Sequence, residues 1–285
     1  LSDYGAWLAS SAAIGMIGLL DPGIGTILTQ RLSALYEHKD DENFSDLFNA
    51  TIFIGLAMFM VSTIIGFLFI ELAIGVMKYS GDVSNDIYIG LIYVVRAVSI
   101  TPLTTIVGSA LQARHDTLYA GISLLVSTLL TIIVLIVGFI TGYGIATLGF
   151  ATFIITICNL LIQSYRLITS GGVKNIFQVC PRKELAIDIM KRSSYLYVPK
   201  GGYIVANNAE VVLIGALISS EMSAVYLISK KIFQLTSMLI DRIGTAVFAG
   251  ASGVFSSNEN ARKNNALNKI LFMSILIGST GVAFS

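Results

Sequence analysis

The feature that most constrains the fold is a long apolar stretch near the start of the sequence, Tyr4–Leu35, whose only charged residues are Asp21 and Arg31. About 25 apolar residues are enough for a helix to cross the roughly 30 Å hydrocarbon core of a bilayer. The stretch is interrupted at Asp21-Pro22-Gly23. One interpretation is that a helix restarts there, with Asp21 as its cap and Pro22 at its first position. The other is a broken helix in which Asp21 is an ion-coupling carboxylate.

The composition of the whole chain indicates an integral membrane protein. Of its 285 residues, 55% are hydrophobic and only 12% are charged, and the mean hydropathy is +0.80. A soluble domain carries about 25% charged residues. The net charge of +1 leaves no basic domain that could hold a nucleic acid. Cys158, Cys180, His38 and His115 are scattered and no GxxxxGK loop occurs, so we expect no metal, no cofactor and no ATP hydrolysis.

Further apolar runs of spanning length follow, so the expected fold class is all-α, a polytopic membrane helix bundle. We predict about seven complete spans and the start of an eighth near Leu267. The seven spans are Tyr4–Thr29, Leu47–Met77, Ile87–Leu111, Leu118–Ile140, Ile145–Ile168, Tyr195–Ile218 and Ser223–Ala249. The chain begins at Leu1 rather than Met and ends at Ser285 inside an apolar run, so we expect a fragment of a longer protein.

Basic residues fall in alternate loops between these spans, which predicts the orientation. One set of loops holds Arg31, Lys39, Arg114, Lys174, Arg182, Lys183, Lys191, Arg192, Arg262, Lys263 and Lys269. The opposite set holds only Lys78, so the first set is expected to face the cytoplasm. Its longest loop, 170–192, is expected to separate an N-terminal lobe at 1–169, which lacks its first span, from the start of a truncated C-terminal lobe at 193–285.

Polar residues form two stripes within the later spans. The sixth span carries Lys200, Tyr203, Asn207 and Glu210 on one face, and the seventh carries Tyr226, Lys230, Gln234, Ser237 and Asp241, with Lys231 beside them. Arg96 lies deep in the third span. A charge at mid-membrane costs about 2.5–3.5 kcal/mol, so such residues should face one another or water. We expect a water-filled, mostly cationic cavity between the lobes. The alternative is a set of internal ion pairs that only lock helices together.

Three short segments carry a resemblance to a known family. They are Tyr4-Gly5-Ala6-Trp7, Leu20-Asp21-Pro22-Gly23 and Leu111-Gln112-Ala113-Arg114. They resemble segments of the polysaccharide biosynthesis family, the O-antigen and capsule flippases of the multidrug/oligosaccharidyl-lipid/polysaccharide (MOP) exporter superfamily. The resemblance implies a two-lobed bundle in the cell inner (plasma) membrane, surrounded by membrane lipids. It also implies glycan polymerase and assembly proteins as partners, and it carries over no catalytic residue, so we expect no enzyme activity.

The cargo implied by the resemblance is an oligosaccharide linked to a polyprenyl pyrophosphate, moved from the cytoplasmic to the outer leaflet by alternating access. The cationic stripes fit this cargo independently, since a buried pyrophosphate needs Arg or Lys. The expected diphosphate contacts are Arg96, Lys200, Lys230 and Lys231, and the expected contacts to sugar hydroxyls are Asn207 and Gln234. The candidate ion-coupling carboxylates are Asp21, Glu71, Glu210 and Asp241.

Rival functions stay open at this point. A cation-coupled multidrug antiporter of the same superfamily would favour carboxylates over cations in the cavity. A membrane glycosyltransferase or polymerase would need a large outer loop or an Asp-rich segment, and the outer loops here are short. A non-transporting scaffold in a glycan assembly complex would have no need of buried charges.

Overall fold

The computed structural model describes residues 2–77, 82–171, 182–231 and 272. Within these ranges every regular element is helical and no residue is in a strand, which confirms the all-α fold class. The elements are α1 (Ser2–Gly15), the short 3₁₀ helix η1 (Met16–Leu20), α2 (Ile24–Glu37), α3 (Asp41–Met77), α4 (Asp82–Ala113), α5 (Thr117–Ile140), α6 (Ala146–Thr169) and α7 (Lys183–Leu217). Residues 220–231 are helical as well.

Four helices of the described residues are long and apolar enough to cross a membrane; they cover Asp41–Leu72, Asn85–Ala113, Thr117–Ile140 and Ala146–Thr169. The pair Tyr4–Leu20 and Ile24–Glu37 passes the same test as one span with a 45° bend. These segments coincide with the first five predicted spans. The sixth falls in α7, whose polar residues keep it out of this group. Most of the seventh lies outside the described residues, as does all of the predicted eighth except residue 272.

The long cytoplasmic loop predicted at 170–192 is partly helical. Because α7 begins at Lys183, the last ten positions of that loop form the first turns of a helix of 35 residues. Lys, Glu, Leu and Arg are good helix formers, and they dominate this segment. Their charges lower the local hydropathy, which ends a predicted span, but they do not oppose helix formation. A span boundary and a helix boundary are therefore different things here.

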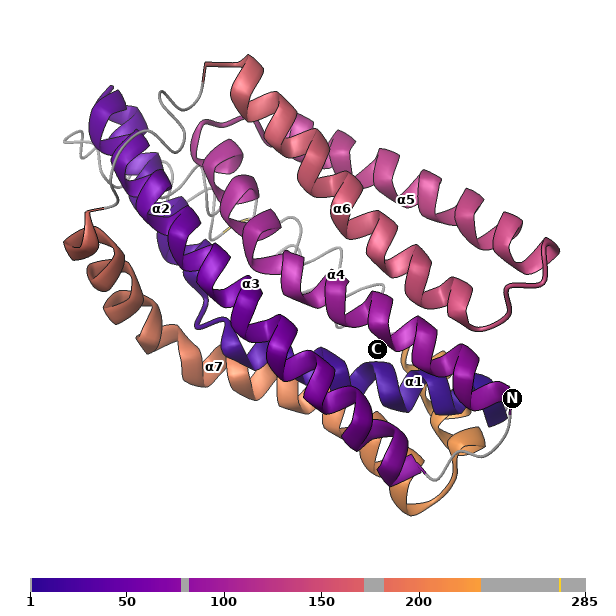
Figure 1. Ribbon diagram of the computed structural model, residues 1–285. Helices are drawn as coiled ribbons and strands as arrows, with labels where there is room; N and C mark the ends of the chain where they lie inside the picture. Colours follow the sequence, from indigo (N-terminus) through magenta and orange to yellow (C-terminus); the bar gives the residue numbers. More distant parts are fainter. Residues whose placement is uncertain (1, 78–81, 172–181, 232–271, 273–285) are drawn as a thin grey trace.

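The helices form a bundle in which α5 and α6 lie side by side along one edge (Figure 1). α7 lies along the opposite edge, with α3 and α4 between them (Figure 1). α4 contacts α6, α3 and α2, and α7 contacts α1. α5 exposes large apolar side chains along its whole length, from Leu118 to Ile140, while Ser123 and Ser127 are buried. Such a surface suits acyl chains, so we expect α5 to face lipid.

Two apolar clusters fill the interior, one on each side of the break at residues 21–23. The first lies at the end predicted to face the cytoplasm, and we call it the cytoplasmic cluster; it contains Ile24, Leu28, Leu32, Phe44, Leu47, Phe48, Ile106, Leu111, Leu167 and Ile189 among others. The second, which we call the outer cluster, contains Trp7, Ile14, Ile17, Ile70, Ile87, Leu91, Val95 and Val211 among others. α2 belongs to the first cluster and α1 with η1 to the second, so the break lies where the two clusters meet.

Glycines permit a close helix crossing between α4 and α6. An added Cβ on Gly149 would lie 2.1 Å from the carbonyl oxygen of Gly90, and one on Gly90 would lie 2.5 Å from the indole of Trp7. Such close backbone contact is how helices associate in lipid, where no hydrophobic effect drives them together. This crossing fixes α6 against α4 at the outer end of the bundle.

We predict that Gly149→Ala weakens the bundle, because its methyl group cannot fit against a backbone oxygen without separating the helices. Overpacking of this kind costs about 1–3 kcal/mol. Gly121→Ala on α5 is the matched control, since nothing lies within 4 Å of its Cβ position. Thermal unfolding of the two variants in the same detergent should show a lower midpoint for Gly149→Ala alone. Equal midpoints would contradict the close crossing.

Candidate functional site

The break in the first span is built around the side chain of Asp21. Its Oδ1 accepts hydrogen bonds from the backbone N–H groups of Gly23, at 2.9 Å, and Ile24, at 3.2 Å. These are donors that the start of a helix leaves unpaired, so the Asp21 side chain satisfies the start of α2, although the N-cap residue is Gly23 and not Asp21 as the sequence interpretation had it. Pro22 is not the first helical residue, however. Gly23 follows it with a φ of +88°, which glycine adopts without strain, and α2 begins only at Ile24.

The second carboxylate oxygen of Asp21 accepts a hydrogen bond from the ammonium group of Lys200 on α7. Lys200 directly follows Pro199, the proline inside α7. Close approach at this point needs glycine, because a Cβ on Gly23 would lie 3.1 Å from the Cβ of Leu196. The side chain of Asp21 is only 14% exposed and that of Lys200 is 36% exposed. One carboxylate therefore holds the start of α2 and also ties the first span to α7.

A second ion pair joins the two polar stripes. The ammonium group of Lys230 lies 2.6 Å from Glu210 Oε2 and 3.4 Å from the backbone oxygen of Asn207. The hydroxyl of Tyr226 donates a hydrogen bond to the same Glu210 oxygen, and its ring lies 5.6 Å from the Lys230 nitrogen. The stripe on α7 thus faces the stripe on helix 220–231, as the sequence predicted. Glu210 remains half exposed.

The other predicted cations stand apart from these pairs. Arg96 is exposed on α4, where its guanidinium lies 5.7 Å from the ring of Tyr93. Tyr93 in turn packs edge-on against Phe150 of α6. Lys231 is exposed, and no ion pair links it to another part of the chain that the structure describes. These contacts do not bring Arg96 to Lys200 or Lys230.

Several predicted site residues either lie outside the described part of the chain or make no contact there that bears on their predicted role. Gln234 and Asp241 lie outside the described residues. The side-chain amide of Asn207 donates to the backbone oxygen of Tyr203 in its own helix, at 2.9 Å. Glu71 is exposed on α3, with no partner recorded in the described ranges. The single cationic cavity shared by all these groups therefore stays a prediction, as does every individual role within it.

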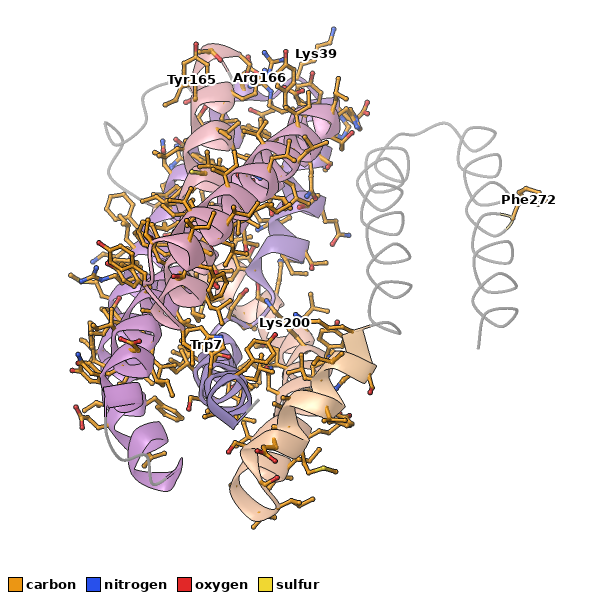
Figure 2. The ribbon with its side chains drawn as sticks, turned by 90° about the vertical axis from the view of Figure 1, so that its right-hand side faces the viewer. Trp7, Lys39, Tyr165, Arg166, Lys200 and Phe272 are labelled. Carbon is orange, nitrogen blue, oxygen red and sulfur yellow. The ribbon has the colours of Figure 1, made fainter. Side chains whose placement is uncertain are left out.

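The pairing of Asp21 with Lys200 was not foreseen, because the two residues are 179 positions apart. A signal for it does exist in the sequence. Asp21 precedes Pro22-Gly23, and Lys200 lies between Pro199 and Gly201-Gly202, so each charge sits at a weak point of its helix. Weak points leave backbone groups to be satisfied, and a charged side chain at such a point is placed to do so. Figure 2 labels Lys200 well below Lys39, Tyr165 and Arg166, which mark the end of the bundle predicted to face the cytoplasm.

Ion pairs also fix the cytoplasmic end of α7. Asp188 accepts hydrogen bonds from Arg31 of α2 and from Arg192, the latter at 3.0 Å. Arg182 lies 3.2 Å from the carboxylate of Asp46 on α3. The hydrogen bond from Arg192, together with the charge of Arg31, lowers the pKa of Asp188 from its ordinary value. The stabilisation from the contacts of Asp188 is therefore fully present above the ordinary carboxyl pKa and is lost as the pH falls through the lowered value.

Chemically, the arrangement offers charge exchange rather than covalent chemistry. Each pair places an ammonium group beside a carboxylate in a span, where the two charges stabilise one another. An anionic ligand, or a proton on the carboxylate, could replace one half of such a pair. Within the described residues, no group of three or more His, Cys, Asp or Glu side chains is arranged to hold a metal ion.

We predict that Asp21→Asn and Asp21→Ala have different effects on stability. Asparagine keeps an oxygen that caps α2 and loses only the ion pair, whereas alanine loses both, and loss of a cap costs about 0.5–2 kcal/mol. Thermal unfolding in detergent should therefore rank the proteins as unchanged chain, then Asn, then Ala. In a double-mutant cycle, Lys200→Met should lower the midpoint less when Asp21 is already Asn. Additive effects would mean that the two side chains do not interact.

The sequence and the fold can be compared with those of known proteins. No protein-family model matches the chain, and no curated protein matches it. Among solved structures, a MATE in complex with MaD3S superposes with a TM-score of 0.74 at 18% identity, over 100% of this chain and 67% of that chain. A MATE in the bent conformation gives 0.68 at 19% identity, over 100% and 67%. An inward-facing multidrug resistance MATE family transporter of the MOP superfamily gives 0.64 at 16%, over 99% and 68%.

These identities show a shared fold and nothing finer. The chain spans about two thirds of the length of each of these structures. The family that the short sequence segments resembled also consists of polytopic helix bundles. The chain therefore has the fold of the MATE transporters.

Proposed function

We propose that this chain is part of a transporter of the MOP superfamily, and that it moves an oligosaccharide linked to a polyprenyl pyrophosphate across the inner membrane by alternating access. Glycan polymerase and assembly proteins would be its partners. The observation that carries the proposal is the ion pair between Asp21 and Lys200, which joins the break in one span to the proline site of another.

The first step of the proposal is exchange of partners at Lys200. A diphosphate brings oxygens that accept charge-assisted hydrogen bonds from an ammonium group, as the Asp21 carboxylate does. Lys200 is more exposed than Asp21, so a headgroup reaches the lysine more easily than the carboxylate. Lys230 is paired with the half-exposed Glu210 and offers a second ammonium group of the same kind. Binding of the headgroup would thus open both pairs.

The second step is movement at the helix breaks. The first span bends by 45° between Leu20 and Ile24, and α7 contains Pro199 beside Gly201. Hinges in proteins are a few residues at element ends that absorb changes in φ and ψ. Asp21 lies at the first break and its bond to Lys200 connects it to the second. Loss of this bond would free the first span and α7 to move relative to one another.

The remaining predicted contacts complete the proposed site. Arg96 and Lys231 are exposed and unpaired within the described ranges, so each retains donors for an anionic ligand. Asn207 lies beside the second pair, where its side-chain oxygen could accept a hydrogen bond from a sugar hydroxyl. Gln234 has the same proposed role and Asp241 is proposed to couple ions, with both outside the described residues.

A cation-coupled multidrug antiporter is the second candidate, and two observations favour it. The similar structures are MATE transporters, one of them described as a multidrug resistance protein. In addition, Lys200 and Lys230 are matched by the carboxylates of Asp21 and Glu210, so these parts of the site are less cationic than the sequence suggested. In this function the carboxylates would bind the coupling ion, and that binding would release the lysines from their ion pairs.

We predict that Lys200→Met in the full-length protein lowers surface glycan about tenfold or more in a host that depends on it for export, since a charge-assisted hydrogen bond contributes about 1.5–3 kcal/mol. Lys230→Met should act in the same direction, and Lys200→Arg should restore part of the export. Lys191→Met is the matched control, because Lys191 is exposed at the cytoplasmic end and has no ion pair there within the described chain. Protein levels in the membrane are measured alongside.

The same variants separate the two functions. Unchanged glycan display with Lys200→Met, together with efflux of organic cations that is lost in Asp21→Asn and Glu210→Gln, would replace the flippase by the antiporter. Loss of glycan display in the lysine variants, without any efflux of organic cations by the unchanged protein, would support the flippase.

A further inference from the structure

A cavity of about 320 Å³ opens at the cytoplasmic end of the bundle, away from both ion pairs of the proposed transport site. It lies between α2, α3 and α7, and its lining residues are Arg31, Ala34, Leu35, Asn43, Leu47 and Leu185. Its size lies at the lower limit of pockets that hold small ligands. About 10 Å of helix separates Arg31 from Ile24 at the break, so the cavity is not part of the Asp21 site.

The wall of the cavity is apolar and its polar groups are few. Among the described residues that line it, Arg31 is the one charged side chain and Asn43 the one other polar side chain. Arg31 donates through Nη1 to Asp188, and a guanidinium group has five N–H donors in all. No partner for its other donors is recorded among the described residues. Asp188 is shared with Arg192, so the three side chains together retain one positive charge.

Asp40 does not line the cavity but is hydrogen-bonded to Asn43, which does. Asp40 accepts hydrogen bonds from the backbone N–H of Asn43, at 3.2 Å, and from its side-chain amide, at 2.7 Å. Both contacts satisfy the carboxylate locally at the start of α3. The positive group that faces the cavity is therefore Arg31.

The position of the cavity selects the kind of ligand. α2 ends at Glu37 and the next span begins at Asp41, so the cavity lies at the depth where lipid headgroups meet acyl chains. Basic pockets between spans on the cytoplasmic side are suited to anionic headgroups. Leu35 and Leu185 are partly buried and pack against the cytoplasmic cluster, so they offer an apolar wall beside the guanidinium.

We propose that this cavity binds the phosphate group of an anionic phospholipid, with Arg31 donating to the phosphate and an acyl chain lying against Leu35 and Leu185. Arg31 also ties α2 to α7 through Asp188, so the lipid would sit at the seam between these helices. The proposal concerns lipid binding and holds whatever cargo the protein carries.

The test uses the full-length protein in detergent, with phosphatidylglycerol and phosphatidylcholine of identical acyl chains, and native mass spectrometry of the bound lipid. Phosphatidylglycerol should be retained about tenfold better, and Arg31→Gln should remove the preference. Arg182→Gln, which breaks the neighbouring ion pair with Asp46 outside the cavity, is the matched control and should keep it. Asp188 still has Arg192 in the Arg31 variant, so no carboxylate is left unpaired.

A second variant covers the case in which Arg31→Gln fails to fold. Ala34→Leu fills the cavity and leaves the guanidinium in place, and it should also lose the preference. Equal retention of the two lipids by the unchanged protein would overturn the proposal, as would equal losses in Arg31→Gln and Arg182→Gln. Displacement of the lipid by millimolar inorganic phosphate would assign the cavity to a soluble phosphate and overturn the proposal of a lipid site.

Discussion

The structure depends on one constraint, that a charge enclosed between membrane spans is costly unless it has a partner. A charged side chain at the bilayer centre costs about 2.5–3.5 kcal/mol on the insertion scale, and an ion pair recovers part of this. Asp21 meets the constraint with two backbone N–H groups and the ammonium group of Lys200. Because these donors come from α2 and α7, the carboxylate can be satisfied only when both helices are in place. The ion pair therefore fixes the relation between the break and α7.

The same break divides the apolar interior. α1 and η1 pack into the outer cluster and α2 packs into the cytoplasmic cluster, so each half of the span is held by its own set of side chains. Packed clusters resist deformation, and a change of shape in such a bundle is most easily taken up where they meet. Gly23, which has positive φ and close contact with Leu196, lies at this junction. A broken span thus combines two rigid halves with one adjustable point.

Much of the fold could be predicted because it follows from the length and composition of apolar runs. Five predicted spans coincide with the helices, and the hydrogen bonds of Asp21 to the start of α2 followed from its position before a helix start. The partners of the charges could not be predicted so fully. Periodicity places Lys200 and Glu210 on one face of a helix, but it does not say which neighbouring helix that face meets. Asp21 and Lys200 are 179 positions apart, and only the packing of α1 and α2 against α7 brings them together. Arg96 illustrates the same limit, because depth in a span does not reveal whether a residue faces a cavity or Tyr93.

The two ion pairs of the spans differ in a way that separates their proposed roles. Asp21 is largely enclosed and makes three hydrogen bonds from three different residues, so its release would disturb the start of α2 as well as the contact to α7. Glu210 is half exposed, and its recorded partners, Tyr226 and Lys230, both lie on the following helix. A ligand can reach Glu210 and Lys230 without disturbing a helix start. If both pairs bind the same headgroup, the more exposed pair, Lys230 and Glu210, is the easier first contact. Only the exchange at Asp21 can transmit binding to the bend of the first span.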